Sequence, residues 1–362
     1  MKKIFFSLII LFATINLFPA DHGIYLLTNK NIQKDFSTIS DAVVNAVKDA
    51  GFNILAIRDI STPDAVREDT TEICGFKGRL VLFTNDEYVK MLTSFGDKYL
   101  VASFLKIGIY QTDKGININI ADPETINRII FNDMDDEPYQ KAVDQTLPFK
   151  KKIVDALHSL NLGESVEEAM EPKRETGELR DADRDMFMMV GPMTYFDDED
   201  QFPVIYKEEE IKDNGRLTAL KEMMFKNIEK FQPSKDDKDY RWTQDPAVDL
   251  KWQIVGEVHS PNNKAIMFGL TRNRTESESF RIVGDETETN KCPGLDHLTA
   301  YPVEVLLLIN DDNELTVQTP REMFRMDMYF WDAGMGAFMD HMQMPGMLDE
   351  SIYHALFAKE KE

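Results

Sequence analysis

Two segments of the chain share one pattern of apolar and polar positions. Residues 106–128 (KIGIYQTDKGININIADPETINR) and 303–325 (VEVLLLINDDNELTVQTPREMFR) each give an apolar strand, a turn that contains aspartate, a second alternating strand and a helix that starts with proline. Pro123 and Pro320 align at a spacing of 197 residues, which places Arg128 and Arg325 in register. Alternation with a period of two predicts strands, and proline at the first helical position costs no hydrogen bond. The pattern predicts an α+β protein of two related sheet-plus-helix units, each a two-layer sandwich, that arose by an internal duplication.

The first unit contains further patterns of this kind. Ile39, Val43, Val44 and Val47 fall on one stripe, which predicts a helix over residues 38–50. Asn85 is a suitable N-cap for a helix that ends at residue 95. We expect strands at residues 23–27, 52–60, 79–84, 99–110 and 116–120, and a long helix over residues 138–160.

The second unit has a weaker pattern. Helical spacing predicts a helix over residues 216–231, and apolar runs predict strands at residues 186–190, 250–258, 265–271 and 280–283. Thr319 and Glu322 have the spacing of a capping box at the start of the repeated helix. The helix that follows Asn85 has no recognisable counterpart, so we expect the duplication to be old or edited.

Composition divides the chain into four parts. Residues 1–20 carry two lysines and then an apolar run too short for a stable membrane-spanning helix, which is typical of a signal peptide. Residues 21–163 form the first unit, and residues 164–184 are so charged that we expect a linker. Residues 185–362 form the second unit, which ends in helices rich in methionine and aromatic residues. The protein is therefore expected to be periplasmic or secreted, without stable membrane insertion after cleavage. Because Phe18 occupies a position where signal cleavage favours a small residue, an uncleaved anchor is the alternative.

The charge balance limits the partners. The chain has 41 basic and 64 acidic residues and a formal net charge of −23. Such an acidic surface repels phosphate backbones, so nucleic acid is not an expected partner. A small ligand, a protein partner or a second copy of the chain in a homodimer are the partners that remain.

The order of elements in residues 42–133 resembles a known bacterial family. The segments GFNILAIRDI, RLVLFTNDEYVKMLTSFG and KIGIYQTDKGININIADPETINRIIFND are similar to those of domain of unknown function 302. The resemblance is closer for the first unit than for the second. It implies a compact α/β sandwich, often dimeric, without an agreed activity and without a catalytic motif to place on this chain. If it holds, the two units would pack on each other as two subunits would.

A methionine-rich segment near the C-terminus is a candidate metal site. Residues 335–347 (MGAFMDHMQMPGM) contain five methionines and one histidine, and thioether and imidazole are ligands that Cu(I) prefers. The candidate ligands for Cu(I) or Ag(I) are Met339, His341, Met342 and Met344. The competing interpretation is a packed core, because methionine at helical spacing commonly fills gaps between aromatic side chains. We give the core interpretation the larger weight and expect the helix to end at Met344-Pro345-Gly346.

The remaining candidate residues give weaker signals. Cys74 and Cys292 are the two cysteines of the chain, and they could form a bridge or stay as thiols. Cys292 and His297 could form a thiol–imidazole pair for a thiol or hydrolytic enzyme. The acidic runs at residues 133–137, 197–200 and 285–288 lack the spacing of an EF-hand, so calcium is a minor candidate. Arg272 and Arg274 could bind a carboxylate or phosphate, although a salt-bridged surface strand is favoured.

The sequence thus favours an exported binding or interaction protein without catalytic activity. Copper or silver binding is the second hypothesis, and the thiol or hydrolytic enzyme is the third. Because binding pockets favour domain interfaces, we expect an apolar cleft between the two units.

Overall fold

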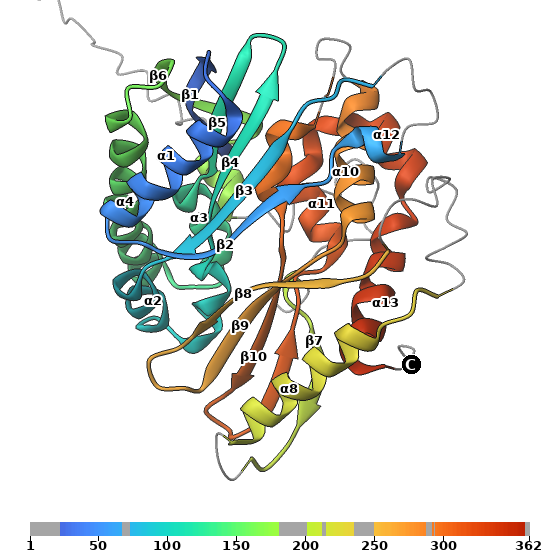
Figure 1. Cartoon of the computed structure of the whole chain (residues 1–362). Helices are drawn as coiled ribbons and strands as arrows, with labels where there is room; N and C mark the ends of the chain where they lie inside the picture. The colour runs from blue at the N-terminus through green and yellow to red at the C-terminus, as the bar shows by residue number, and fades with distance from the viewer. Residues whose placement is uncertain are drawn as a thin grey trace, which may run out of the picture.

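The computed structural model describes residues 22–66, 73–180, 201–211, 215–234, 250–286, 292 and 294–358. It is an α+β fold with two antiparallel sheets and flanking helices (Figure 1). The signal peptide expected at residues 1–20, the strand expected at 186–190 and the acidic run at 197–200 lie outside the described residues. Within the described part of the chain, no helix is both long and apolar enough to cross a membrane.

The first unit forms a six-stranded sheet in the order β2-β3-β4-β5-β1-β6. Its strands are β1 (His22–Ile32), β2 (Asn53–Ile60), β3 (Gly78–Thr84), β4 (Leu105–Thr112), β5 (Gly115–Ala121) and β6 (Glu164–Arg174). Its helices are α1 (Phe36–Asp49), α2 (Asp86–Thr93), α3 (Pro123–Ile130), α4 (Asp136–Ser159) and the short α5 (Thr176–Arg180), with 3₁₀ turns η1 (Pro63–Val66) and η2 (Asp97–Ser103). The strand β5 and the helices α1, α2 and α4 agree with the sequence analysis within a few residues. The strand predicted at residues 99–110 is wrong in its first part, because residues 99–103 belong to η2 and β4 starts only at Leu105.

The second unit forms a five-stranded sheet in the order β7-β11-β10-β9-β8. Its strands are β7 (Val204–Glu208), β8 (Gln253–His259), β9 (Ala265–Thr271), β10 (Val303–Ile309) and β11 (Leu315–Gln318). Its helices are α8 (Gly215–Lys230), α10 (Asn273–Glu286), α11 (Glu322–Phe330), α12 (Gly334–His341) and α13 (Met344–Phe357), with 3₁₀ turns η3 (Leu295–Ala300) and η4 (Trp331–Ala333).

The two sheets have the same strand order when matched by sequence. β2-β3-β4-β5-β1 in the first corresponds to β8-β9-β10-β11-β7 in the second, and α2 after β3 corresponds to α10 after β9. The prediction that the helix after Asn85 has no counterpart is therefore wrong, and so is the strand predicted at residues 280–283, which lies inside α10. Phe280 and Val283 are buried on one side of that helix. The shared order fits an internal duplication, which stays a prediction.

The segment expected to be a linker differs from that prediction. Its first eleven residues form β6, which pairs antiparallel with β1 along most of its length. The side chains of β6 are largely exposed, so its polar composition concealed the backbone pairing at this edge of the sheet. Of the predicted linker, residues 175–180 follow the sheet and include α5, and residues 181–184 lie outside the described residues.

The start of α11 also differs from the predicted capping box. Asp122 caps α3 and accepts a hydrogen bond from the Glu124 amide, as the sequence predicts. In α11, however, the N-cap residue Arg321 makes no capping bond with its side chain, and the Glu322 amide donates instead to Asp349 Oδ1 of α13 at 3.1 Å. The Glu322 carboxylate binds Arg325. The second copy therefore uses Glu322 for a buried ion pair.

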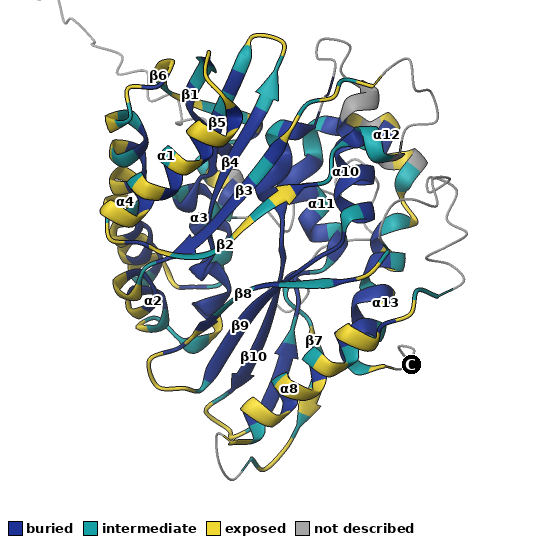
Figure 2. Ribbon diagram, viewed as in Figure 1, coloured by how far each residue is buried: buried dark blue, intermediate teal, exposed yellow. Residues whose placement is uncertain are grey.

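The central strands of each sheet are buried on both faces (Figure 2). In β3, Val81 and Phe83 pack beneath α1, α2 and α4, while Leu80 and Leu82 point toward the second unit. Figure 1 shows the helices of the first unit on the outer side of their sheet, away from the second unit. This two-sided burial accounts for the near-continuous apolar runs of β3 and β10.

The units pack through their sheets by exchanging 3₁₀ turns. η2 of the first unit contacts β9 and β10, and η3 of the second unit contacts β3, β4 and β5. Gly108 makes room for η3, because a Cβ at this position would lie 2.9 Å from Leu298 Cδ1. Lys106 and Glu304 meet in this interface at 2.6 Å, and both are buried. Lys106 pairs with Leu82 of β3, and Glu304 pairs with Gly269 of β9. Each partner is the third residue from the end of its strand, so Lys106 and Glu304 occupy equivalent positions in the two sheets.

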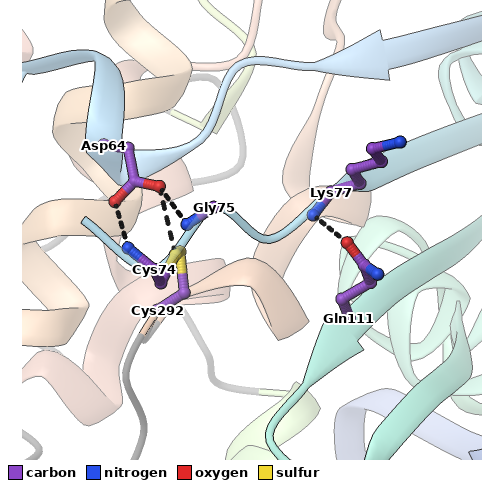
Figure 3. The surroundings of a disulfide bond; sticks show 6 residues. All are labelled: Asp64, Cys74, Gly75, Lys77, Gln111 and Cys292. Carbon is purple, nitrogen blue, oxygen red and sulfur yellow. Dashed lines mark hydrogen bonds between the residues drawn. A yellow bond between two sulfur atoms is a disulfide. The ribbon is translucent and has the colours of Figure 1, made fainter.

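A disulfide also joins the units. Cys74 follows η1 in the first unit and forms a disulfide with Cys292 in the second. Of the two alternatives given by the sequence, a bridge or two thiols, the structure has the bridge. Figure 3 shows Asp64 beside the bridge, where its carboxylate accepts from the amides of Cys74 (3.1 Å) and Gly75 (2.9 Å). This carboxylate holds the loop that carries Cys74.

Candidate binding pocket

A pocket of about 640 Å³, part of it open to solvent, lies among the helices of the second unit. Its walls come from α10, α11, η4, α12 and α13. Most lining side chains are apolar, and five carry polar groups. The lining residues are Ser279, Ile282, Tyr301, Glu322, Met326, Asp327, Phe330, Trp331, Ala333, Gly334, Ala337, Met344, Pro345 and Leu348.

The sequence of α11 explains one wall of the pocket. Glu322, Met326 and Phe330 are spaced four residues apart, so they lie on one side of the helix and face the pocket. Phe324 and Met328 lie on another side and pack into the core. One amphipathic helix thus supplies both a core face and a pocket face.

The pocket remains open because small residues stand where α12 faces it. Ala333, Gly334 and Ala337 line this wall, and Ala337 is 4% exposed. A large side chain at one of these positions would extend into the open space. Apolar pockets with a few convergent polar groups are typical of sites for small organic molecules.

Two buried carboxylates belong to the pocket wall. Both oxygens of Glu322 accept from Arg325 Nη1, at 3.1 and 2.9 Å. Burial raises the pKa of Glu322, and Arg325 opposes that shift. Asp327 Oδ1 accepts from Arg174 Nη2 at 2.6 Å, so β6 of the first unit reaches into the support of this site. Neither arginine lines the pocket.

Two hydroxyl groups complete the polar part of the wall. Ser279 Oγ lies 2.8 Å from the carbonyl oxygen of Thr275, and the Tyr301 hydroxyl lies 2.7 Å from Ser279 Oγ and 3.3 Å from the same carbonyl. Burial raises the pKa of Tyr301, so its hydroxyl stays protonated. Both hydroxyl groups therefore donate their protons to acceptors within the protein.

The pockets between the units differ from the apolar cleft that the sequence predicts. One, of about 600 Å³, lies between η2 and β10 and includes Lys98 and Asp133. The other, of about 770 Å³, lies between β2 and β8 and includes Asp86, Lys90 and Glu257. Charged residues line both, while the more apolar pocket lies inside the second unit.

The four candidate copper ligands lie around the end of α12 without sharing one environment. Met339 and Met342 are exposed at 53% and 43%, whereas Met344 opens α13, lines the pocket and contacts the core. His341 Nδ1 donates to the carbonyl oxygen of Ala337 at 2.6 Å. The helix expected to end at Met344-Pro345-Gly346 ends at His341, and a second helix, α13, begins at Met344 because proline fits its first turn.

The thiol–imidazole hypothesis is not supported by the surroundings of its two residues. Cys292 is in the disulfide, so it carries no thiol here. His297 Nδ1 lies 2.8 Å from Asp296 Oδ1, and Nε2 lies 3.0 Å from Asp332 Oδ1. A ring that donates from both nitrogens is an imidazolium, which cannot act as a base. Burial alone would lower the pKa of His297, but Asp296 and Asp332 outweigh it and raise this pKa to about 10.

The other candidate residues lead to no ligand site. Among the described residues, Asp64, Cys74 and Cys292 are the one cluster of His, Cys, Asp or Glu side chains near enough to share an ion, and its sulfurs form the disulfide. Arg272 and Arg274 are buried and do not lie on a surface strand. Arg272 stacks on Trp252, with its Cζ 4.5 Å from the ring centroid.

The sequence analysis did not assign any residue to this pocket, and it placed Glu322 in a capping box and Met344 in a metal site. Glu322, Arg325 and Asp327 stand among apolar and aromatic residues in EMFRMDMYFW. Charges inside such a run are a signal of buried ion pairs, because an unpaired charge is costly to bury. The signal could have located α11, but Tyr301 and Ser279 join the site only through the fold.

Comparisons with known proteins add little. No family model matches the chain, and no curated protein matches it. Among solved structures, the crystal structure of an uncharacterized conserved protein DUF302 from Bacillus stearothermophilus is similar. The two are 12% identical, with a TM-score of 0.29, over 37% of this chain and 96% of that chain.

Proposed function

We propose that this chain is an exported binding protein without catalytic activity, and that it takes a small, largely apolar molecule into the pocket among α10, α11, α12 and α13. The pocket supports the proposal because it combines apolar walls with buried polar groups already held by partners. The imidazolium state of His297 and the bridged state of Cys292 favour a binding role over thiol chemistry. Export rests on the pattern of residues 1–20.

Titration with a neutral apolar dye tests the proposal. N-phenyl-1-naphthylamine should bind with a stoichiometry of one and gain fluorescence as it leaves water. Ala337→Phe should abolish the gain because the new ring fills the pocket, while Ala337→Ser, which adds one atom, should keep it. Thermal unfolding of both variants shows whether each is folded. Dye binding that is absent from the wild type, or equal in Ala337→Phe, would contradict the proposal.

A second readout does not depend on a folded Ala337→Phe variant. Trp331 lines the pocket, so its emission should transfer to the bound dye. Trp331→Phe should retain dye binding and lose much of this energy transfer. Unchanged transfer would place the dye elsewhere and exclude this pocket.

Copper binding is the second candidate, favoured by the exposure of two thioethers. Met339 and Met342 contribute little to packing, although methionine usually fills cores. The Nδ1 bond of His341 to the Ala337 carbonyl oxygen fixes the ring at the end of α12. Wild type should bind Cu(I) more tightly than a variant with leucine at Met339, Met342 and Met344, measured by competition with a Cu(I) chelator. Equal affinities would exclude the site.

A further inference from the structure

The pocket between η2 and β10 has walls from both units and differs in chemistry from the apolar pocket among the helices. Its volume is about 600 Å³, part of it open to solvent. Its walls come from η2, from α3 and the residues after it, from the segment before β7, and from β10 and β11. Three of its lining side chains end in a carboxamide, those of Asn132, Gln201 and Gln318.

The charged groups of this pocket are paired with one another. Lys98 forms an ion pair with Asp133 through Oδ2, and Asp133 Oδ1 accepts from the Tyr99 hydroxyl at 2.7 Å. Both oxygens of the carboxylate therefore have a donor. Since Lys98 and Asp133 cancel, the pocket presents no net charge to a ligand.

The Gln201 carboxamide is the exceptional polar group of the wall. Gln201 is 2% exposed, and its Nε2 has no hydrogen-bond partner among the described residues. The carboxamides of Asn132 and Gln318 are half-buried and form no side-chain hydrogen bond within the described part of the chain. Because a buried donor without a partner is unfavourable, a ligand atom that accepts from Gln201 would stabilise this site.

The carboxamides determine which ligand groups fit. Each of them donates through its NH₂ group, accepts through its oxygen and carries no charge. A hydroxyl group also donates and accepts, so a small molecule with several hydroxyls complements the three carboxamides. Val101, Ile130 and Leu306 line the same pocket and offer an apolar surface to the C–H groups of such a molecule.

The strands around the pocket favour a small molecule over a peptide. An extended peptide binds to a sheet by adding to a free strand edge. β10 pairs with β9 and β11, and β11 pairs with β10 and β7, so both strands that line the pocket already have a neighbour on each side. A ligand at this wall is therefore held by side chains.

We infer that the pocket between the units binds a neutral sugar, with hydroxyl groups bonded to the carboxamides of Gln201, Gln318 and Asn132 and C–H groups against the apolar part of the wall. This site is separate from the apolar pocket of the proposed function, and its residues come from both units.

Saturation-transfer NMR with four neutral sugars tests the inference on the wild-type protein. Glucose, galactose, mannose and N-acetylglucosamine present their hydroxyl and amide groups in different arrangements. At least one should bind, with a dissociation constant of about 1 mM or lower. Glucuronate and glucosamine, which are charged, should bind no more tightly than glucose. The inference is wrong if none of the four sugars binds, or if a charged derivative binds more tightly than all of them.

The variant Gln201→Met removes the carboxamide and keeps a side chain of similar length. It should lower sugar affinity about tenfold because a buried hydrogen bond to the ligand is lost. Its urea midpoint without sugar should stay the same or rise, because the deleted donor has no partner within the described protein. Gln140→Met makes the same change at an exposed position of α4 and should leave sugar affinity unchanged.

Two results for these variants would contradict the inference. Equal sugar affinity in Gln201→Met and the wild type would remove Gln201 from the site. A large loss of stability in Gln201→Met would show that its carboxamide serves the fold instead of a ligand. Gln318→Met should also weaken sugar binding, which tests the wall formed by β11.

Competition separates this inference from the proposed function. Saturating N-phenyl-1-naphthylamine should leave sugar affinity unchanged, because the dye is expected in the other pocket. Displacement of the sugar by the dye would place both in one site and overturn the inference. Absence of dye binding together with normal sugar binding would contradict the proposed function alone.

Discussion

His297 shows how one residue can link several elements. Its ring lies 13° from parallel with the Phe330 ring and 4.9 Å, centroid to centroid, from Tyr25 of the first unit. Asp296 and Asp332 bind both of its nitrogens, and the residue is 2% exposed. This charged histidine is therefore part of the packing between the units.

The pH dependence of stability should report on His297. Because its folded pKa is raised to about 10 from 6.5, its contribution is fully present below pH 6.5 and is lost as pH rises through about 10. Between these values the wild type should lose about 1.4 kcal/mol of unfolding free energy per pH unit from this group. Urea unfolding at pH 6.5 to 10 measures the slope, and His297→Gln should flatten it. An equal slope in that variant would exclude His297 as its source.

The ion pair between Lys106 and Glu304 should behave as a coupled pair. Burial lowers the pKa of Lys106, and Glu304 opposes that shift. Lys106→Met should cost about 3–5 kcal/mol, because it leaves the Glu304 carboxylate buried without its partner. The double variant Lys106→Met, Glu304→Leu should recover most of this loss. Denaturant unfolding of the two singles and the double gives the coupling, and additive losses would refute it.

Among the elements, α10 is a helix although the local sequence pattern predicted a strand at residues 280–283. Its contacts with the rest of the fold explain the difference. Its polar first half buries Glu276, which binds Arg58 of the first unit at 2.9 Å. Ser277 and Ser279 bond back to carbonyl oxygens four residues earlier. These bonds satisfy buried polar groups that would otherwise oppose a helix here. The strand predicted at residues 280–283 was wrong because a short apolar run fits either element.

The N-cap of α2 is a local feature that the sequence did predict. Asn85 Oδ1 accepts from the amides of Glu87 and Tyr88 at 2.9 and 3.2 Å. Asn85→Ala should lower the unfolding free energy by about 1 kcal/mol, and Asn85→Ser should lose less because it keeps a capping oxygen. Chemical denaturation compares the three proteins. A serine variant as unstable as the alanine variant would show that the cap is not the cause.

At the scale of the molecule, the disulfide and the exchanged 3₁₀ turns join two units of the same strand order. The bridge closes a loop of 218 residues, for which chain entropy gives an upper limit of about 5 kcal/mol. The double variant Cys74→Ser, Cys292→Ser should therefore unfold at a lower denaturant concentration than the oxidised wild type. The reduced wild type should show the same lower midpoint. If reduction leaves the midpoint unchanged, the bridge does not stabilise the folded state.

The sequence by itself determined the local elements and the α+β class. Alternation, caps and the proline at the start of α3 depend on neighbours within a few residues, so hairpins and helices such as β4–β5 and α1 could be predicted. Only the tertiary structure decided which segments meet. Glu322 and Tyr301 come together from positions 21 residues apart, and Arg174 reaches Asp327 from the other unit. A pocket depends on contacts between residues far apart in the sequence and on the small residues of α12 that leave space. A local sequence pattern predicts neither of these.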